Sequence, residues 1–177
     1  MGRPKGFNRD DLLEKAIQLF SKKGFADTSL QDLQRATRVN KSGLYTEFKS
    51  KEDLFLSSLR HYIERSGARE VLSREPLGWA NIAAFLDIGQ NCQGCFIANT
   101  VREISILPKG AREAIDAHLQ EVETLLIRNM QVELPRKEAQ MKASLILTFN
   151  AGLRLGENLS PQKTNPRLKE AFLKLIH

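Results

Sequence analysis

The chain has 177 residues, of which 41% are hydrophobic and 27% charged, the usual balance of a folded globular protein. No apolar run approaches the roughly 18 residues that a membrane-spanning helix needs. The N-terminal residues are charged and amphipathic rather than signal-like, and two cysteines make no disulfide framework. We therefore expect a cytoplasmic protein with no membrane partner.

The basic residues are concentrated at the front of the chain. Residues 1–52 carry eleven of the 27 Lys and Arg residues and seven of the 21 Asp and Glu residues, a local net charge of +4 within a total of +6. Such a segment favours a polyanionic partner such as nucleic acid. An ordinary solvated surface is the alternative.

The first predicted elements are two helices. In residues 9–23 apolar residues recur at i, i+3, i+4 and i+7, which predicts one apolar stripe, and Gly24 ends the helix. A short second helix stops near Thr37. Thr28 and Ser29 both have capping-box spacing, so either could precede its first turn.

Two further helices follow almost at once. Asn40 is a good N-cap for a third helix of residues 41–48. Ser50 has capping spacing to Asp53 and opens a fourth helix, which we expect to continue to Leu72.

The remainder of the chain predicts more helices and no strands, because period-two alternation is absent. Further helices are expected over residues 79–88, 95–106, 108–130, 136–159 and 167–176. The predicted fold class is all-α, with a three-helix domain in residues 1–50 and a larger helical domain in residues 51–177.

The second and third helices have the form of a helix-turn-helix, in which the second helix of the pair fits the major groove of DNA. Leu44 and Phe48 lie four residues apart and give this helix one buried edge. The exposed positions are then Lys41, Ser42, Gly43 and Thr46. Gly43 either allows the backbone to approach DNA closely or is merely tolerated. Tyr45 is either a half-buried core residue or a donor to phosphate.

Residues 24–55, GFADTSLQDLQRATRVNKSGLYTEFKSKEDLF, resemble the DNA-binding segment of the tetracycline-repressor (TetR/AcrR) family. The matching elements are Gly24-Phe25, Thr28-Ser29-Leu30, Val39-Asn40, Leu44-Tyr45-Thr46-Glu47-Phe48 and Ser50-Lys51-Glu52-Asp53-Leu54. The segment GCFIANTVREI is similar to a Gly-Cys-aliphatic segment in the bodies of some members. The opening MGRPKGF resembles the basic arm of others.

The resemblance implies an all-helical homodimer that represses transcription and leaves a near-palindromic operator when a small molecule binds. By position, it implies DNA contacts at Thr28, Lys41, Ser42, Gly43, Tyr45 and Thr46, phosphate contacts at Lys49 and Lys51, and a basic arm containing Arg3. No cofactor, metal site or catalytic constellation is expected, and the chain is not predicted to be an enzyme.

Two residues depart from the family pattern. Gln34 stands where a small residue usually packs between the two helices, and Arg38 stands where the turn usually has glycine. A left-handed Arg38 would cost about 1 kcal/mol. The geometry of the turn is therefore left open by the sequence.

Two sites are expected in the helical body. An effector pocket between its helices could be lined by Trp79, Phe85, Phe96 and Phe149, which could equally be plain core. The small residues Gly152 and Gly156, with Leu168 and Phe172 on the last helix, could form a two-fold interface. Packing within the chain is the alternative.

Cys92 and Cys95 form a lone CxxC motif, which is half a zinc site at most. Either they are small residues near a helix start, or they sense oxidants or electrophiles, since a thiol at a helix N-terminus tends to be acidified. A thiol redox protein using these cysteines, and a DNA-binding protein without a ligand effect, remain the alternatives to a ligand-responsive repressor.

Overall fold

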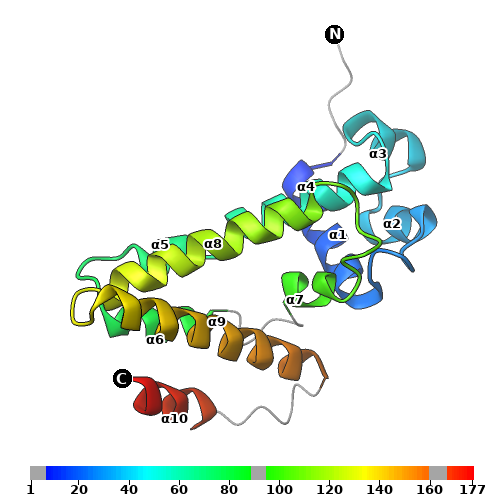
Figure 1. The fold of residues 1–177 in the computed structure, drawn as a ribbon. Coiled ribbons are helices and arrows are strands. Elements are labelled where there is room, and N and C mark those ends of the chain that lie inside the picture. Colours follow the sequence, from blue (N-terminus) through cyan, green and yellow to red (C-terminus); the bar gives the residue numbers. More distant parts are fainter. Residues whose placement is uncertain (1–6, 89–94, 160–166) are drawn as a thin grey trace.

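The computed structural model describes residues 7–88, 95–159 and 167–177, and every regular element in these residues is a helix (Figure 1). The helices of the front half are α1 (Arg9–Lys23), α2 (Leu30–Thr37), α3 (Lys41–Glu47), α4 (Lys51–Glu64) and α5 (Ala68–Leu72). Those of the back half are α6 (Trp79–Asp87), α7 (Phe96–Val101), α8 (Ala111–Met130), α9 (Arg136–Leu159) and α10 (Arg167–Ile176). The predicted all-α class is confirmed.

Two predicted helices are shorter than expected. The fourth helix does not reach Leu72, because α4 ends at Glu64 and Gly67, with φ of 73°, separates it from α5. A glycine adopts this left-handed conformation without the steric cost that a side chain brings. The helix expected over residues 95–106 ends at Val101, and turns follow it.

Each of the first four helices begins with a side-chain cap. The side chains of Asn8, Ser29, Asn40 and Ser50 each accept a hydrogen bond from a backbone N–H of the first turn. Ser29 forms a full capping box with Asp32, so Ser29, and not Thr28, is the N-cap of α2. The caps expected at Asn40 and Ser50 are confirmed.

Helices α5 to α8 begin differently. Their N-cap positions are Gly67, Gly78, Cys95 and Gly110, and none of these makes a side-chain cap hydrogen bond. Since local capping does not fix where these helices start, packing against their neighbours must do so.

Two hydrophobic cores fill the molecule. The first contains residues of α1, α2, α3 and α4, and it also takes in Phe96 of α7 and Ala111 and Ile115 of α8. The second lies between α5, α6, the second half of α8, α9 and the end of α10. The predicted boundary at residue 50 falls between α3 and α4, and the first core extends across it into α4, α7 and α8.

In Figure 1, α1, α2 and α3 gather at one end, and we call residues 9–50 the head. Helices α4 and α8 run from the head along the molecule, while α7 lies between α1 and α9. Among the described residues, no helix combines the length and the apolarity that crossing a bilayer would require.

Candidate nucleic-acid interface and ligand cavity

The turn between α2 and α3 is short and tightly held. It consists of Arg38, Val39 and Asn40, and Arg38 adopts the left-handed conformation, with φ of 60° and ψ of 22°. Val39 is buried and its N–H donates to the hydroxyl of Thr37 at 3.3 Å. Arg38 therefore occupies the left-handed position of the turn at a steric cost of about 1 kcal/mol.

One edge of α3 is buried and the opposite face is exposed. Leu44 and Phe48 are 2% and 3% exposed, which confirms the predicted buried edge. Lys41, Ser42 and Thr46 are exposed, and the Tyr45 ring is 47% exposed, so Tyr45 is not a core residue. The ammonium of Lys41 lies 5.8 Å from the centre of the Tyr45 ring. The face offers a cation, hydroxyls and a phenol to the outside.

Gly43 has a packing reason that the sequence did not reveal. A Cβ atom at this position would lie 2.7 Å from Cγ1 of Val39 and 3.2 Å from Oδ1 of Asn40. The same Asn40 oxygen caps α3 by accepting from the N–H of Gly43 at 2.8 Å. Gly43 therefore lets the turn close on the first turn of α3.

Thr28 is buried in the head, and the half-buried Lys51, at the start of α4, bonds to the same part of the head. Thr28 is 1% exposed, and its hydroxyl donates to the carbonyl of Gly24 at 2.5 Å. The ammonium of Lys51 donates to the carbonyls of Phe25 and Thr28 at 2.9 and 3.1 Å and lies 4.3 Å from the centre of the Phe25 ring. These two predicted DNA contacts thus use their polar atoms to hold the loop before α2.

Lys49 is exposed beyond the end of α3, and its backbone N–H donates to Asp53 at 2.8 Å. Arg3 lies outside the described residues. Arg9 is exposed at the start of α1, and its guanidinium lies 5.4 Å from the centre of the Phe48 ring.

An ion pair joins the end of α1 to the start of α2. Lys23 Nζ lies 2.7 Å from Oδ2 of Asp32, which also accepts from the N–H and the hydroxyl of Ser29. The hydrogen bond from Lys23, followed by those from Ser29, holds the pKa of Asp32 well below its usual range. The capping carboxylate is thus charged at neutral pH.

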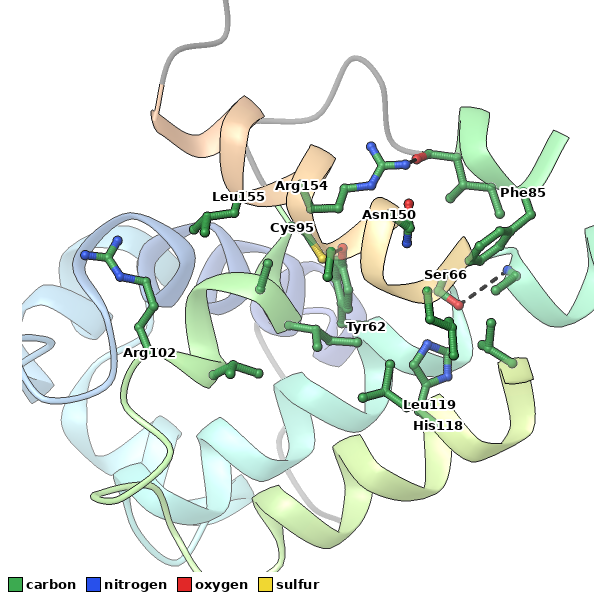
Figure 2. A pocket seen from close by; sticks show the side chains of 18 residues that line it. Tyr62, Ser66, Phe85, Cys95, Arg102, His118, Leu119, Asn150, Arg154 and Leu155 are labelled. Atoms are coloured by element: carbon green, nitrogen blue, oxygen red, sulfur yellow. Dashed lines mark hydrogen bonds between the residues drawn. The ribbon is translucent and has the colours of Figure 1, made fainter. Parts of the chain in front are cut away.

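The body contains a cavity of about 380 Å³ between the α4–α5 turn and helices α6 to α9 (Figure 2). Its wall is mostly apolar, which is typical of a small-molecule site. Of the four aromatic residues expected there, Phe85 lines the cavity. Trp79 instead donates to Glu133, Phe96 packs on Phe55 and Tyr62, and Phe149 stacks on Phe172. Helical spacing does not distinguish a core face from a cavity face.

Several polar side chains interrupt this apolar wall. Tyr62 Oη donates to Cys95 Sγ at 3.5 Å, and the buried Oδ1 atom of Asn150 has no hydrogen-bond partner among the described residues. Arg154 is 7% exposed and donates to the carbonyls of Leu86 and Ile88, at the end of α6. Figure 2 shows these groups converging on one side of the cavity, with His118 on the other. Burial lowers the pKa of His118 and favours its neutral form.

Cys95 was predicted to be near a helix start, and it occupies the N-cap position of α7. It also lines the cavity, half-buried. Cys92 lies outside the described residues.

The small residues expected at an interface face outward. Gly152 and Gly156 are exposed on α9, with no atom within 4 Å of an added Cβ. Exposed apolar side chains lie on α9 (Met141, Leu145 and Leu155) and on α10 (Leu168 and Leu175). Phe172 differs, because its ring stacks on Phe149 of its own chain at 3.8 Å between centres.

The family model described as "Bacterial regulatory proteins, tetR family" matches residues 12–57, which include all of α2 and α3. The HTH-type transcriptional repressor ComR of Escherichia coli (strain K12) is 37% identical over 114 residues, 59% of this chain and 54% of ComR. The chain thus spans about half the length of this curated relative.

Solved structures share the whole fold. The reduced form of E. coli NemR has a TM-score of 0.77 at 23% identity and covers 95% of this chain and 94% of its own. CifR, a TetR family transcriptional regulator solved as a cysteine mutant complexed with a 26-bp double-strand operator DNA, has a TM-score of 0.68 at 24% identity and covers 98% and 96%. At these identities, the likeness concerns the fold.

Proposed function

Because the chain belongs to the tetR family of bacterial regulatory proteins, we propose that it is a cytoplasmic DNA-binding repressor that acts as a homodimer and leaves its operator when a small molecule binds. Membership of a family of regulators agrees with the expectation that the chain is not an enzyme.

The exposed face of α3 carries this proposal. Buried Leu44 and Phe48 fix the helix to the head, so that its outward side chains keep one orientation. Lys41, Ser42, Tyr45 and Thr46 would contact DNA, with Ser42 and Thr46 nearest to base edges and Lys41 and Lys49 on phosphates. A relative of the same fold is described with operator DNA bound, which supports this docking.

The exposed face of α9 and α10 supports a dimer. Gly152 and Gly156 leave room for a second helix to approach, and Leu168 and Leu155 supply apolar surface that a lone chain leaves in water. A two-fold pair of heads would read two half-sites about one helical turn of DNA or a multiple of it apart.

The cavity in the body is the proposed effector site. Its apolar wall favours an apolar or aromatic compound, and the unpartnered Oδ1 of Asn150 favours one that carries a hydrogen-bond donor. Of the four aromatic residues that the sequence suggested for this site, Phe85 would contact the effector.

Cys95 supports a second candidate, in which the effector reacts covalently. An α,β-unsaturated carbonyl compound in the cavity would form an S–C bond at its β-carbon, while the proton of the thiol ends on the α-carbon and no group leaves. The contact between Tyr62 Oη and Cys95 Sγ favours this candidate, because a hydroxyl donor stabilises developing negative charge on sulfur. Equal operator release by a quinone from wild type and Cys95→Ser would exclude it.

The decisive experiment is a footprint of the protein on the DNA upstream of its own gene, with and without candidate compounds. Protection of a near-palindromic site that is lost on adding a compound supports a ligand-responsive repressor. Protection that no compound relieves would favour a DNA-binding protein without a ligand effect, and no protection of any site would contradict the proposal.

A further inference from the structure

Helix α7 has one side on the cavity and one side on the head. Cys95, Ile97, Ala98, Val101 and Arg102 line the cavity. The residues between them and just beyond point to the head: Phe96 lies in its core, and Asn99 and Glu103 bond to its backbone. A ligand in the cavity that displaces α7 would therefore also displace α1 and the loop that follows it.

Glu103, just after α7, holds that loop by its N–H groups. Its Oε2 atom accepts from the N–H of Phe25 at 2.6 Å, and its Oε1 atom accepts from the N–H of Ala26 at 3.0 Å. Two consecutive backbone donors on one carboxylate form a small anion-binding nest. Charge-assisted hydrogen bonds of this kind are about twice as strong as neutral ones.

Gly24 makes this contact possible in two ways. Its φ of 84° is a left-handed conformation that favours glycine, and a Cβ atom there would lie 2.7 Å from Oε2 of Glu103. The glycine that ends α1 therefore also admits the carboxylate from a residue 79 positions later.

The same loop is held from its other side by Lys51, which donates to the carbonyls of Phe25 and Thr28. Glu103 thus accepts hydrogen bonds from the N–H groups of this segment, and Lys51 donates to its carbonyls. The segment leads directly into Ser29, the N-cap of α2. The position of this segment sets the position of α2, and through the three-residue turn that of α3.

Two further contacts attach α7 to the head. Asn99 Nδ2 donates to the carbonyl of Ser21 in the last turn of α1 at 3.0 Å. The ring of Phe96 lies 5.6 Å from that of Phe55, which lies 5.0 Å from that of Phe25. Of Glu103, Asn99 and Phe96, Glu103 is the residue that bonds to the backbone of the loop itself.

We infer that Glu103 is a positioning residue that couples occupancy of the cavity to the DNA-reading helix, by moving the loop between α1 and α2 together with α7. This inference rests on the proposed function. It identifies the α7–loop contact as the point at which the body acts on the head.

The first test is a double-mutant cycle that needs no identified effector. Ala98→Phe places a ring in the cavity from α7, and Glu103→Gln removes the charge and leaves one acceptor oxygen. Affinity for the footprinted operator is measured by fluorescence anisotropy for wild type, both single variants and the double variant. Glu113→Gln is the matched control, because Glu113 is exposed on the first turn of α8.

We expect Ala98→Phe to weaken operator binding about tenfold in the wild-type background, within the usual range of allosteric coupling, and less than about twofold in the Glu103→Gln background. With Glu113→Gln in place of Glu103→Gln, the effect of Ala98→Phe should stay about tenfold. Additive effects of Ala98→Phe and Glu103→Gln, or no effect of Ala98→Phe alone, would overturn the inference. A wild-type protein that binds no DNA would instead contradict the proposed function.

A second measurement uses the unaltered chain. The fluorescent dye 1-anilinonaphthalene-8-sulfonate, which has apolar rings and an anionic sulfonate, is titrated until its signal saturates. Hydrogen exchange of the backbone is then followed with and without the dye. We expect the amides of Phe25 and Ala26 to exchange faster when the probe is bound and those of the Asn40-capped turn to be unchanged. Unchanged exchange at both amides with the cavity occupied would overturn the inference.

Discussion

The head and the body begin their helices in different ways. Asn8, Ser29, Asn40 and Ser50 cap the three helices of the head and the adjoining α4 with a side chain, whereas α5 to α8 of the body begin at three glycines and a cysteine without such a bond. The head is thus specified locally, and the body is held by packing around a cavity. This division suits the proposed function, in which a ligand bound in the body would shift the position of the head.

The largest effect is expected at the aromatic cluster where the two regions meet. Phe55 is 1% exposed and packs edge-on against Phe20, Phe25 and Phe96. Phe55→Ala should lower the free energy of unfolding by about 3–5 kcal/mol, through lost burial and the cavity left behind. Urea denaturation measures this change. Leu175→Ala, at a side chain 84% exposed, is the control, and an equal loss in both variants would contradict the cluster's role.

The next effect separates two lysines at the α3–α4 junction, Lys49 and Lys51, which look alike in sequence. Lys51→Ala should cost about 1.5–3 kcal/mol of unfolding free energy, because the ammonium bonds two backbone carbonyls. Lys49→Ala should leave stability nearly unchanged and lower the salt slope of operator binding by about one unit. Thermal denaturation and a salt titration of the binding constant measure the two quantities. If Lys51→Ala instead lowered the salt slope and Lys49→Ala lowered the stability, Lys51 would be a DNA contact and this account would be wrong.

A smaller effect is expected at the capped helix starts. Asn40→Ala removes the acceptor for the N–H of Gly43 and should cost about 0.5–2 kcal/mol of unfolding free energy. Ser42→Ala, at an exposed position of the same first turn, should change it by less than about 0.5 kcal/mol. If the two changes were equal in urea denaturation, local capping would not be what holds α3.

The smallest effect concerns His118 in the body, whose pKa burial lowers while nearby Glu121 raises it and Arg69 lowers it. A group with a depressed folded pKa favours the neutral form, so its contribution to stability is present above the unfolded value of about 6.5 and is lost as pH falls below it. His118→Gln should therefore flatten the stability profile between about pH 7 and pH 5. His177→Gln, at the exposed end of the chain, is the control. A profile that His118→Gln leaves unchanged would contradict this account.

Local patterns were enough to predict the head. The stripe of α1, the N-caps Asn40 and Ser50, and the buried edge formed by Leu44 and Phe48 depend on residues a few positions apart, and the structure confirms each of them. The outward face of α3 followed from the same spacing. These features were readable because helix capping and amphipathicity act within one or two turns.

The tertiary structure alone decided what distant residues do. Lys51 and Thr28 turn inward to the loop before α2, Gly43 is required by Val39, and three of the four aromatic residues assigned to the cavity lie elsewhere. The fold also brings the carboxylate of Glu103 to the N–H of Phe25, 78 positions away in the sequence. The physical reason is that a side chain's role depends on the partner that packing places beside it, and such long-range contacts leave no periodic trace in the sequence.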